Sequence, residues 1–277
     1  MKWKGLAKKG FFYTTFIFTF VVLMSLVNDS FSHVYVHPDA SSKDSLNYTI
    51  NELSERLLLS VKTEDSTGSI RKELKSIPLD SLIRTLNTDD KKNAFWVNMY
   101  NAYYQILYTD FDLRSPAIYK ASLIEISELQ LTLDDIEHGI LRRYRHKYSL
   151  GYLPQLFVSK NIKQLAVSEV DYRIHFALNC GAKSCPAIAF YSSDKINSQL
   201  DLSAKSFISQ ETTIDSVTNE VHVSKLFSWF RADFGGKSGT KEIINKYLGV
   251  SVNDYKLSYN EYDWTESMEN YDESRFE

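Results

Sequence analysis

The stretch RIHFALNCGAKSCP, Arg173–Pro186, holds both cysteines of the chain, Cys180 and Cys185, and one of its six histidines, His175. Its first half is an apolar run, which predicts a buried strand carrying His175 at the centre of a sheet. A glycine and a closing proline punctuate its second half and predict a loop. Nucleophilic and metal-assisted chemistry both use Cys and His, so we expect the functional site here.

The composition is that of an ordinary globular protein, with 43% hydrophobic and 24% charged residues in a chain of 277. Ten glycines and five prolines are too few for a turn-rich all-β protein. A net charge of −3 provides no basic field, so we expect no nucleic-acid partner. The sequence contains no G-x-S-x-G, Walker, G-x-G-x-x-G or H-E-x-x-H motif. We therefore expect no cofactor, and these motifs assign no residue as a metal ligand.

The N-terminus has the pattern of a targeting segment. Four lysines and no acidic residue precede an apolar run, Phe11–Val27. Small residues follow at Ser30 and Ser32, with the spacing that a signal peptidase needs. Residues 1–32 are therefore a cleaved signal peptide or, through residues 11–27, a membrane anchor near the lower length limit for spanning a bilayer. Both interpretations predict an exported protein that is periplasmic, extracellular or anchored to the membrane.

Helical patterns dominate the N-terminal half. A polar linker is expected first, and apolar positions then recur at helical spacing. The predicted linker is residues 33–45, and the predicted helices are residues 46–61, 70–77 and 78–86. Asp89 and Asp90 predict the start of the strongest helix, residues 93–107.

Two amides lie on one stripe of that strongest helix. Asn98 and Asn101 are three residues apart on a helix that is aromatic on nearly every side, so the helix should be buried. Buried amides need hydrogen-bond partners. The two side chains either fix neighbouring loops through the backbone or take part in a site.

The C-terminal half mixes short strands with helices. Alternation over residues 123–133 predicts a strand, and Asp134–Asp135 predicts the start of a helix that carries Glu137 and His138. Residues 212–223 predict a strand pair, and an aromatic helix with Trp229 should follow.

The fold class predicted by these patterns is α+β. A helical N-terminal half should pack on a small, mostly antiparallel sheet in a single domain, residues 46–265. Residues 266–277 form an acidic tail that we expect to be loose.

The order of the motifs resembles the domain of unknown function family 547 (DUF547). Five blocks between residues 75 and 265 carry the resemblance: NAFWVNMYN at 93–101, EHGILR at 137–142, DYRIHFALNCGAKSCP at 171–186, LFSWFRADF at 226–234 and YDW at 262–264. The third block is the most distinctive, although Tyr172 stands where the family usually has proline. The resemblance brings with it a suggested similarity to papain-like and transglutaminase-like folds, which implies a cysteine nucleophile, a histidine base and a polar orienting residue.

Four interpretations of the Cys/His residues remain open. Cys185 could be a nucleophile with His175 or His138 as its base and Asn98 or Asn101 as the orienting residue. In papain-type enzymes, however, the cysteine precedes the histidine, and here the order is reversed. Export favours a Cys180–Cys185 disulfide instead. Two cysteines and two histidines also suit zinc, although the C-x4-C spacing is unusual. The last interpretation is two buried thiols in a tight turn.

Two functions of different classes follow. The first is a cysteine-dependent hydrolase or acyltransferase acting on peptide or amide bonds. The second is a non-catalytic envelope module that binds a peptide, a glycan or a partner protein through an aromatic cleft, with a structural disulfide. The candidate catalytic residues are Cys185, His175, His138 and Asn98, and the candidate binding residues are Asn101, Glu137, Lys183, Cys180 and Trp229.

Overall fold

The structure is a computed structural model that describes residues 49–273. These residues belong to one compact unit. The predicted signal peptide or anchor, the predicted linker and the last four residues lie outside the described part. Within it, no helix combines the length and the apolar character that crossing a bilayer would need.

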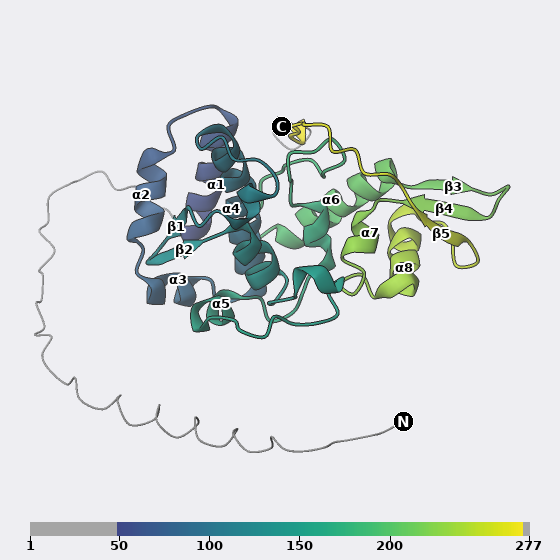
Figure 1. The fold of residues 1–277 in the computed structure, drawn as a ribbon, viewed down its shortest axis with the longest axis horizontal. Helices are drawn as coiled ribbons and strands as arrows, with labels where there is room; N and C mark the ends of the chain where they lie inside the picture. Colours follow the sequence, from purple (N-terminus) through teal and green to yellow (C-terminus); the bar gives the residue numbers. More distant parts are fainter. Residues whose placement is uncertain (1–48, 274–277) are drawn as a thin grey trace, which may run out of the picture. The chain divides into compact units, whose positions relative to one another are not determined.

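The N-terminal half is built around α4 (Asp89–Thr109), the helix that the sequence predicts as the strongest. Helices α1 (Ile50–Lys62), α2 (Gly68–Ser76) and α3 (Leu79–Thr85) accompany it, and Figure 1 shows the four gathered at one end of the molecule. The Thr88 side chain caps α4 by accepting a hydrogen bond from Lys91 N. Every residue of α4 from Asn93 to Leu107 is buried, so this helix has no solvent face.

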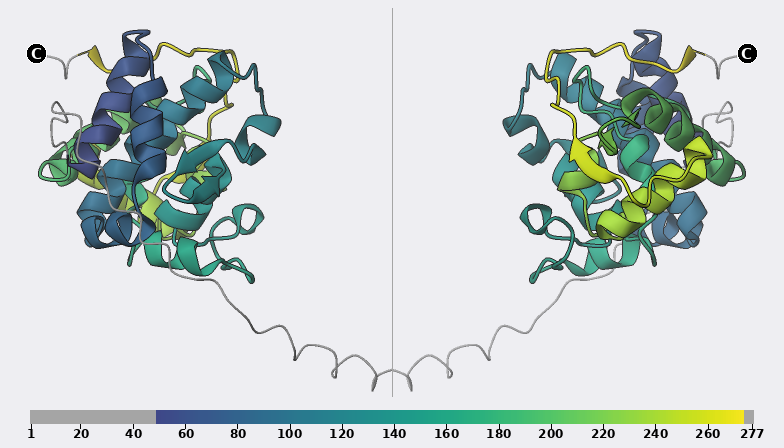
Figure 2. Two further views of the ribbon diagram at one scale, coloured as in Figure 1. Left: turned by 90° about the vertical axis from the view of Figure 1, so that its left-hand side faces the viewer. Right: turned by 90° about the vertical axis from the view of Figure 1, so that its right-hand side faces the viewer.

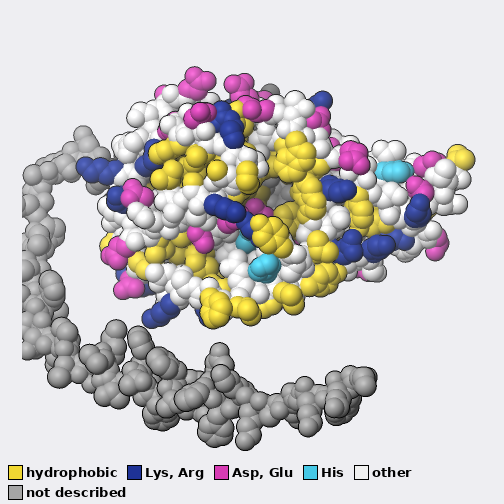
Figure 3. Space-filling model, viewed as in Figure 1, with side chains coloured by type: hydrophobic (Ala, Val, Ile, Leu, Met, Phe, Trp, Pro, Cys, Tyr) yellow, Lys and Arg dark blue, Asp and Glu magenta, His cyan; other side chains and the backbone are white. Residues whose placement is uncertain are grey.

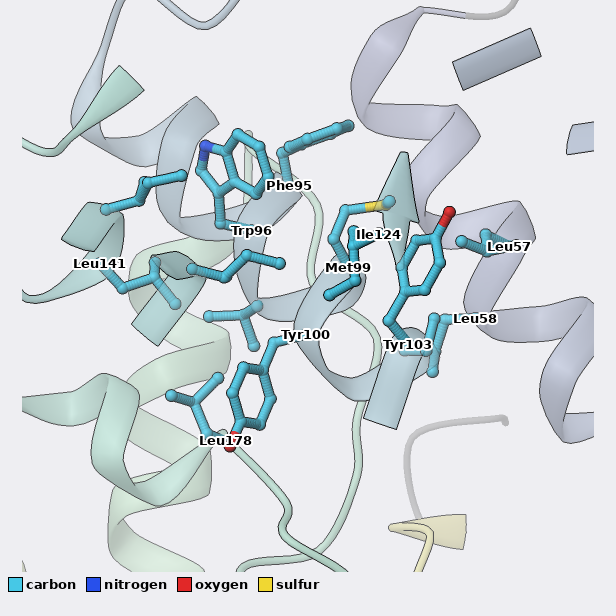
Figure 4. Packing of buried hydrophobic residues seen from close by; sticks show 14 of the residues in the cluster. Leu57, Leu58, Phe95, Trp96, Met99, Tyr100, Tyr103, Ile124, Leu141 and Leu178 are labelled. Atoms are coloured by element: carbon cyan, nitrogen blue, oxygen red, sulfur yellow. The ribbon is translucent and has the colours of Figure 1, made fainter. Parts of the chain in front are cut away.

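Large side chains of α4 form the centre of the main core. Phe95 and Trp96 meet edge to face with ring centroids 4.9 Å apart. Figure 4 shows Met99 and Tyr103 turned toward the leucines of α1, and Tyr100 turned the other way, toward Leu178. Because both sides of α4 are covered, its polar side chains must find partners inside the protein.

A β-hairpin and several short helical turns follow α4. Strands β1 (Ile124–Ile126) and β2 (Leu129–Leu131) pair antiparallel, so the single strand predicted over residues 123–133 is a hairpin of two short strands. Around them lie η1 (Ala117–Lys120), the π-helix η2 (Asp135–Leu141), η3 (Lys147–Ser149) and α5 (Lys160–Leu165).

The predicted strand through His175 is wrong. Residues 172–176 form a 3-10 helix, η4 (Tyr172–Phe176), which the Asp171 side chain caps by accepting from Arg173 N. The apolar run is buried within the core rather than on one face of a sheet. A short run that is buried on all sides gives no periodicity by which a strand differs from a helical turn.

The C-terminal half contains α6 (Ile196–Glu211), β3 (Thr213–Asp215), β4 (Glu220–Val223), α7 (Leu226–Trp229), α8 (Gly236–Leu248) and β5 (Lys256–Tyr259). Strands β3 and β4 are antiparallel, and β5 joins β4 in parallel. Phe176, Phe207, Phe227 and Phe234 pack together in a second cluster of buried residues. The α+β class is therefore confirmed, although the structure has two small, mostly antiparallel sheets where one was predicted.

The expected loose tail is wrong for residues 266–272. Ser267 N donates to Gly181 O, Ile188 N donates to Asn270 O, and Asp272 N donates back to Ile188 O. Figures 1 and 2 show this segment leaving β5 and crossing the molecule toward the helices of the N-terminal half. Its acidic composition suggested solvent, but its backbone groups pair with the loop that holds the cysteines.

Candidate functional site

A cavity of about 570 Å³ brings together five of the predicted site residues: Glu137, His138, His175, Cys180 and Trp229. Other walls come from tyrosines and from Trp264 near the C-terminus. Figure 3 shows hydrophobic side chains gathered on the face of the molecule drawn there, which is hollowed near its middle. A larger polar hollow of about 1020 Å³ lies beside α1 and the end of α4, but it contains none of the predicted residues.

The π-helix η2 positions the acidic and basic groups of the cavity. It starts where Thr132 and Asp135 hydrogen-bond each other through side chain and backbone. The widened turn is closed by Arg142 N, which donates to Glu137 O at 2.8 Å. Such π-turns occur frequently at functional sites because they re-aim side chains. Here the turn buries Glu137, His138 and Arg142 together.

Arg142 fixes the protonation of His138. Arg142 Nη1 lies 2.7 Å from His138 Nδ1, and a guanidinium can only donate. His138 is therefore neutral, with its proton on Nε2, which lies 3.7 Å from Asp134 Oδ1. Burial, together with the Arg142 charge, lowers the pKa of His138 to about 3.

A second histidine meets the same arginine through a carboxylate. His175 Nε2 lies 2.9 Å from Asp233 Oδ2, which also accepts from Arg142 Nε at 2.6 Å. The His175 ring stacks on the Phe230 ring, with centroids 4.0 Å apart. The Arg142 guanidinium also lies over the Phe230 ring. The Arg142 and Asp233 side chains have no exposed surface.

The surroundings shift the pKa values of the titratable groups in this network in different directions. Burial raises the pKa of Glu137, against the nearby Arg142 charge, so its carboxyl holds its proton more strongly than usual. Burial also lowers the pKa of His175, more than Asp233 raises it. Burial alone would raise the pKa of Asp233, but hydrogen bonds from His175 and Arg142 lower it overall. The stable state is therefore a neutral His175 beside an Asp233–Arg142 ion pair.

Gly151 packs against the Arg142–Asp233 ion pair. Arg142 Nη2 and Asp233 Oδ1 make no hydrogen bond within the described chain. Both face Gly151, where an added Cβ would lie 2.5 Å from Asp233 Oδ1 and 3.0 Å from Arg142 Nη2. Gly151 also has a φ of +86°, which favours glycine. Its lack of a side chain lets the backbone of residues 150–152 lie against the buried pair.

We expect the stability of the protein to depend on His138 under acidic conditions. An unfolded His138 binds a proton below about pH 6.5, whereas the folded one stays neutral down to about pH 3. Unfolding therefore takes up a proton in this window, and stability falls as the pH drops through it. Between pH 6.5 and pH 4.5, the free energy of unfolding should fall in the unaltered protein by up to about 2–3 kcal/mol more than in the variant His138→Gln. Urea unfolding at the two pH values measures this difference.

The matched control is His222→Gln on β4, whose side chain is 40% exposed. This variant should keep the acid-dependent loss of the unaltered protein. An equal loss in all three proteins would show that His138 is not the group responsible.

The two cysteines form a disulfide, with Cα atoms 6.1 Å apart. Cys180 lines the cavity, whereas Cys185 lies on a separate small hollow with Lys183. Both sulfurs contact Tyr262 Oη, Cys185 Sγ at 3.1 Å and Cys180 Sγ at 3.4 Å. Cys185 is held in the disulfide with Cys180, and His175 is hydrogen-bonded to Asp233. The structure therefore does not pair the predicted nucleophile with the predicted base.

The asparagines of α4 bind backbone outside the cavity. Asn98 Nδ2 donates to Tyr191 O, and Asn98 Oδ1 accepts from Tyr191 N. Asn101 makes the equivalent pair with Ala177 O and Asn179 N. Neither residue lines the cavity. The Lys183 side chain is exposed and pairs with Asp263.

Several residues of this site escape prediction from the sequence. Neither Asp233 nor Arg142 is among the predicted site residues, yet both side chains are buried. Tyr262 and Trp264 belong to the motif at residues 262–264, and they line the cavity. Asp233 stands between Phe230 and Phe234, a local signal that does not distinguish a buried acid from a solvated one. The described residues contain no cluster of His, Cys, Asp or Glu that could hold a metal ion.

The fold and the site define a mixed α+β protein with an aromatic cavity above a buried His–Asp–Arg network. Residues 83–208 match the family described as "Protein of unknown function, DUF547". This segment of the chain is thus DUF547-like. No curated protein and no solved structure matches it. Trp229, Asp233, Tyr262 and Trp264 all lie beyond the matched segment.

Proposed function

We propose that the chain is a non-catalytic binding module of the cell envelope that takes a glycan or peptide segment into its aromatic cavity. The observation that carries the proposal is the group of stacked rings on the cavity wall. Trp229, Tyr262 and Trp264 lie within 4.6–5.7 Å of one another by ring centroids. Trp264 is 59% exposed, so its ring offers a flat apolar face to a ligand.

The chemistry of the walls supports binding over thiol catalysis. A disulfide has no thiolate to attack a carbonyl carbon. Glu137 and His138 line the same cavity and would supply polar groups that fix the orientation of a ligand, as in most small-molecule sites. A disulfide is also the expected state of two cysteines in an oxidising compartment, which agrees with the proposed export.

Tryptophan fluorescence tests the binding function. Defined oligosaccharides and short peptides are titrated into the protein, and the emission of Trp229 and Trp264 should change and saturate with one class of probe. The variant Trp264→Ala should bind that probe about tenfold more weakly or worse, because one stacking face is removed. Trp264→Phe, which keeps an aromatic face, serves as the matched control. Equal affinity of the Ala variant and the unaltered protein would refute the proposed binding surface.

A second candidate is acid–base catalysis in the same cavity, favoured by the His175–Asp233 pair and by Glu137, whose pKa is raised by burial. With Nε2–H donated to Asp233, Nδ1 of His175 is the nitrogen that can accept a proton from water. Glu137 could give its proton to a leaving group. Hydrolysis of a bound probe, lost in both His175→Gln and Glu137→Gln with binding retained, would favour catalysis over the binding module.

A further inference from the structure

One exposed segment combines positive charge with apolar side chains. We call residues 143–163 the basic apolar loop. It contains five cations, Arg143, Arg145, Lys147, Lys160 and Lys163, and no acidic residue. The whole chain has a net charge of −3, so this stretch opposes the sign of the rest. Such a local excess points to a negatively charged partner.

The apolar side chains of the loop lie outside the protein. Phe157 is 99% exposed and its neighbour Leu156 is 85% exposed. Tyr148, Tyr152 and Leu153 are also mostly exposed. Single exposed apolar residues are ordinary, but five large ones on one segment of about ten residues mark an interaction surface.

The backbone of the loop is tied to the body of the protein. His146 N donates to Leu153 O, Gln155 N donates to Tyr144 O, and Ala232 N donates to Leu150 O. Arg145 Nη1 donates to Gly151 O within the loop. These bonds hold the apolar side chains outward at a fixed place, so their exposure is a property of the fold.

We propose that the basic apolar loop docks onto an anionic lipid surface. Phe157 and Leu156 would enter the interface between headgroups and acyl chains, where aromatic and aliphatic side chains of peripheral proteins lie. Arg143, Lys160 and Lys163, all exposed, would lie among the anionic headgroups. A loop with exposed apolar residues flanked by cations has the chemistry of an interfacial membrane anchor, in which the apolar side chains enter the bilayer surface and the cations meet anionic headgroups.

The docked loop would place the cavity beside the lipid. Lys147, Tyr148 and Leu150 belong to the loop and also line the cavity. Figure 3 shows hydrophobic side chains along the edge of the face that carries the hollow. This inference goes beyond the proposed ligand binding, and it holds or fails independently of which ligand the cavity takes.

The test uses the full chain with a solvent-sensitive fluorophore on a single new thiol. The label is attached at Phe157→Cys, and the native disulfide stays closed. The control label is at Val217→Cys, on the turn between β3 and β4. Val217 is 90% exposed and, unlike Phe157, does not belong to the basic apolar loop. Vesicles are made from phosphatidylcholine alone or from an equal mixture of phosphatidylcholine and phosphatidylglycerol.

The expected result is a blue shift of the emission at position 157 with the anionic vesicles and none at position 217. Adding Lys160→Glu and Lys163→Glu should remove most of that shift, because two attractions become repulsions. Equal emission at both positions on anionic vesicles overturns the proposal, even when the N-terminal segment holds the chain on the membrane. A shift at position 157 that rises with protein concentration in the absence of vesicles also overturns it, since a second copy would then be the partner.

Discussion

Replacing Asp233 with alanine is expected to lower the free energy of unfolding by about 3–5 kcal/mol. Asp233 is the carboxylate that neutralises Arg142, and neither side chain has any exposed surface. Its removal leaves a buried guanidinium charge without a counter-ion and takes away the hydrogen bond to His175. The guanidinium keeps one bond, to His138, which carries no charge. Urea unfolding followed by circular dichroism measures the loss.

The control is Glu125→Ala, which breaks the ion pair with Lys75 at 2.8 Å on the surface. Both of those side chains are about half exposed, so the change should stay below about 1 kcal/mol. The double variant Arg142→Met with Asp233→Leu should recover part of the loss, because no unpaired charge is left buried. If Asp233→Ala costs no more than Glu125→Ala, the buried network does not stabilise the fold as described.

Replacing Gly181 with alanine should lower the free energy of unfolding by about 2–5 kcal/mol. Gly181 lies between the cysteines with a φ of +71°. An added Cβ would lie 2.7 Å from Met268 Sδ and 2.8 Å from Tyr104 Cε1. The methyl group would therefore push the C-terminal segment away from α4 in addition to straining the backbone. Chemical denaturation measures the loss, and faster proteolysis of residues 263–273 should accompany it.

Gly249→Ala isolates the backbone part of that effect. Gly249 has a similar φ of +67°, but nothing lies within 4 Å of its added Cβ. This variant should lose only about 1–2 kcal/mol. Two equal losses would mean that Met268 and Tyr104 give way at no cost, and that the C-terminal segment is not held tightly at Gly181.

The long helix and the hairpins could be predicted because their signals are local. Asp89 and Asp90 mark the start of α4, and its dense aromatic sequence predicted burial on all sides. Alternation over residues 123–133 predicted a strand where the structure has the β1–β2 hairpin, and residues 212–223 predicted the β3–β4 pair. Each of these features depends on residues that are neighbours in the chain.

The arrangement of the site could not be predicted because its partners are distant in the chain. Asp233 and His175 are 58 positions apart, and Arg142 is a further 33 positions before His175. Nothing in the local sequence distinguishes a buried acid from a solvated one when each stands between aromatic residues. For Asn98 the sequence left two roles open, and the structure shows the one in which the side chain fixes a neighbouring segment, through hydrogen bonds to the Tyr191 backbone.

The C-terminal segment has a consequence for the order in which the protein folds. Tyr262 contacts both sulfurs of the disulfide, and Gln105 Nε2 of α4 donates to Met268 O. Tyr262 is 82 positions from Cys180 and 77 from Cys185, and Met268 is 163 positions from Gln105. Contacts between such distant residues require a long loop of chain to be closed first, so they form slowly. We therefore expect this wall of the cavity to be among the last parts of the protein to fold.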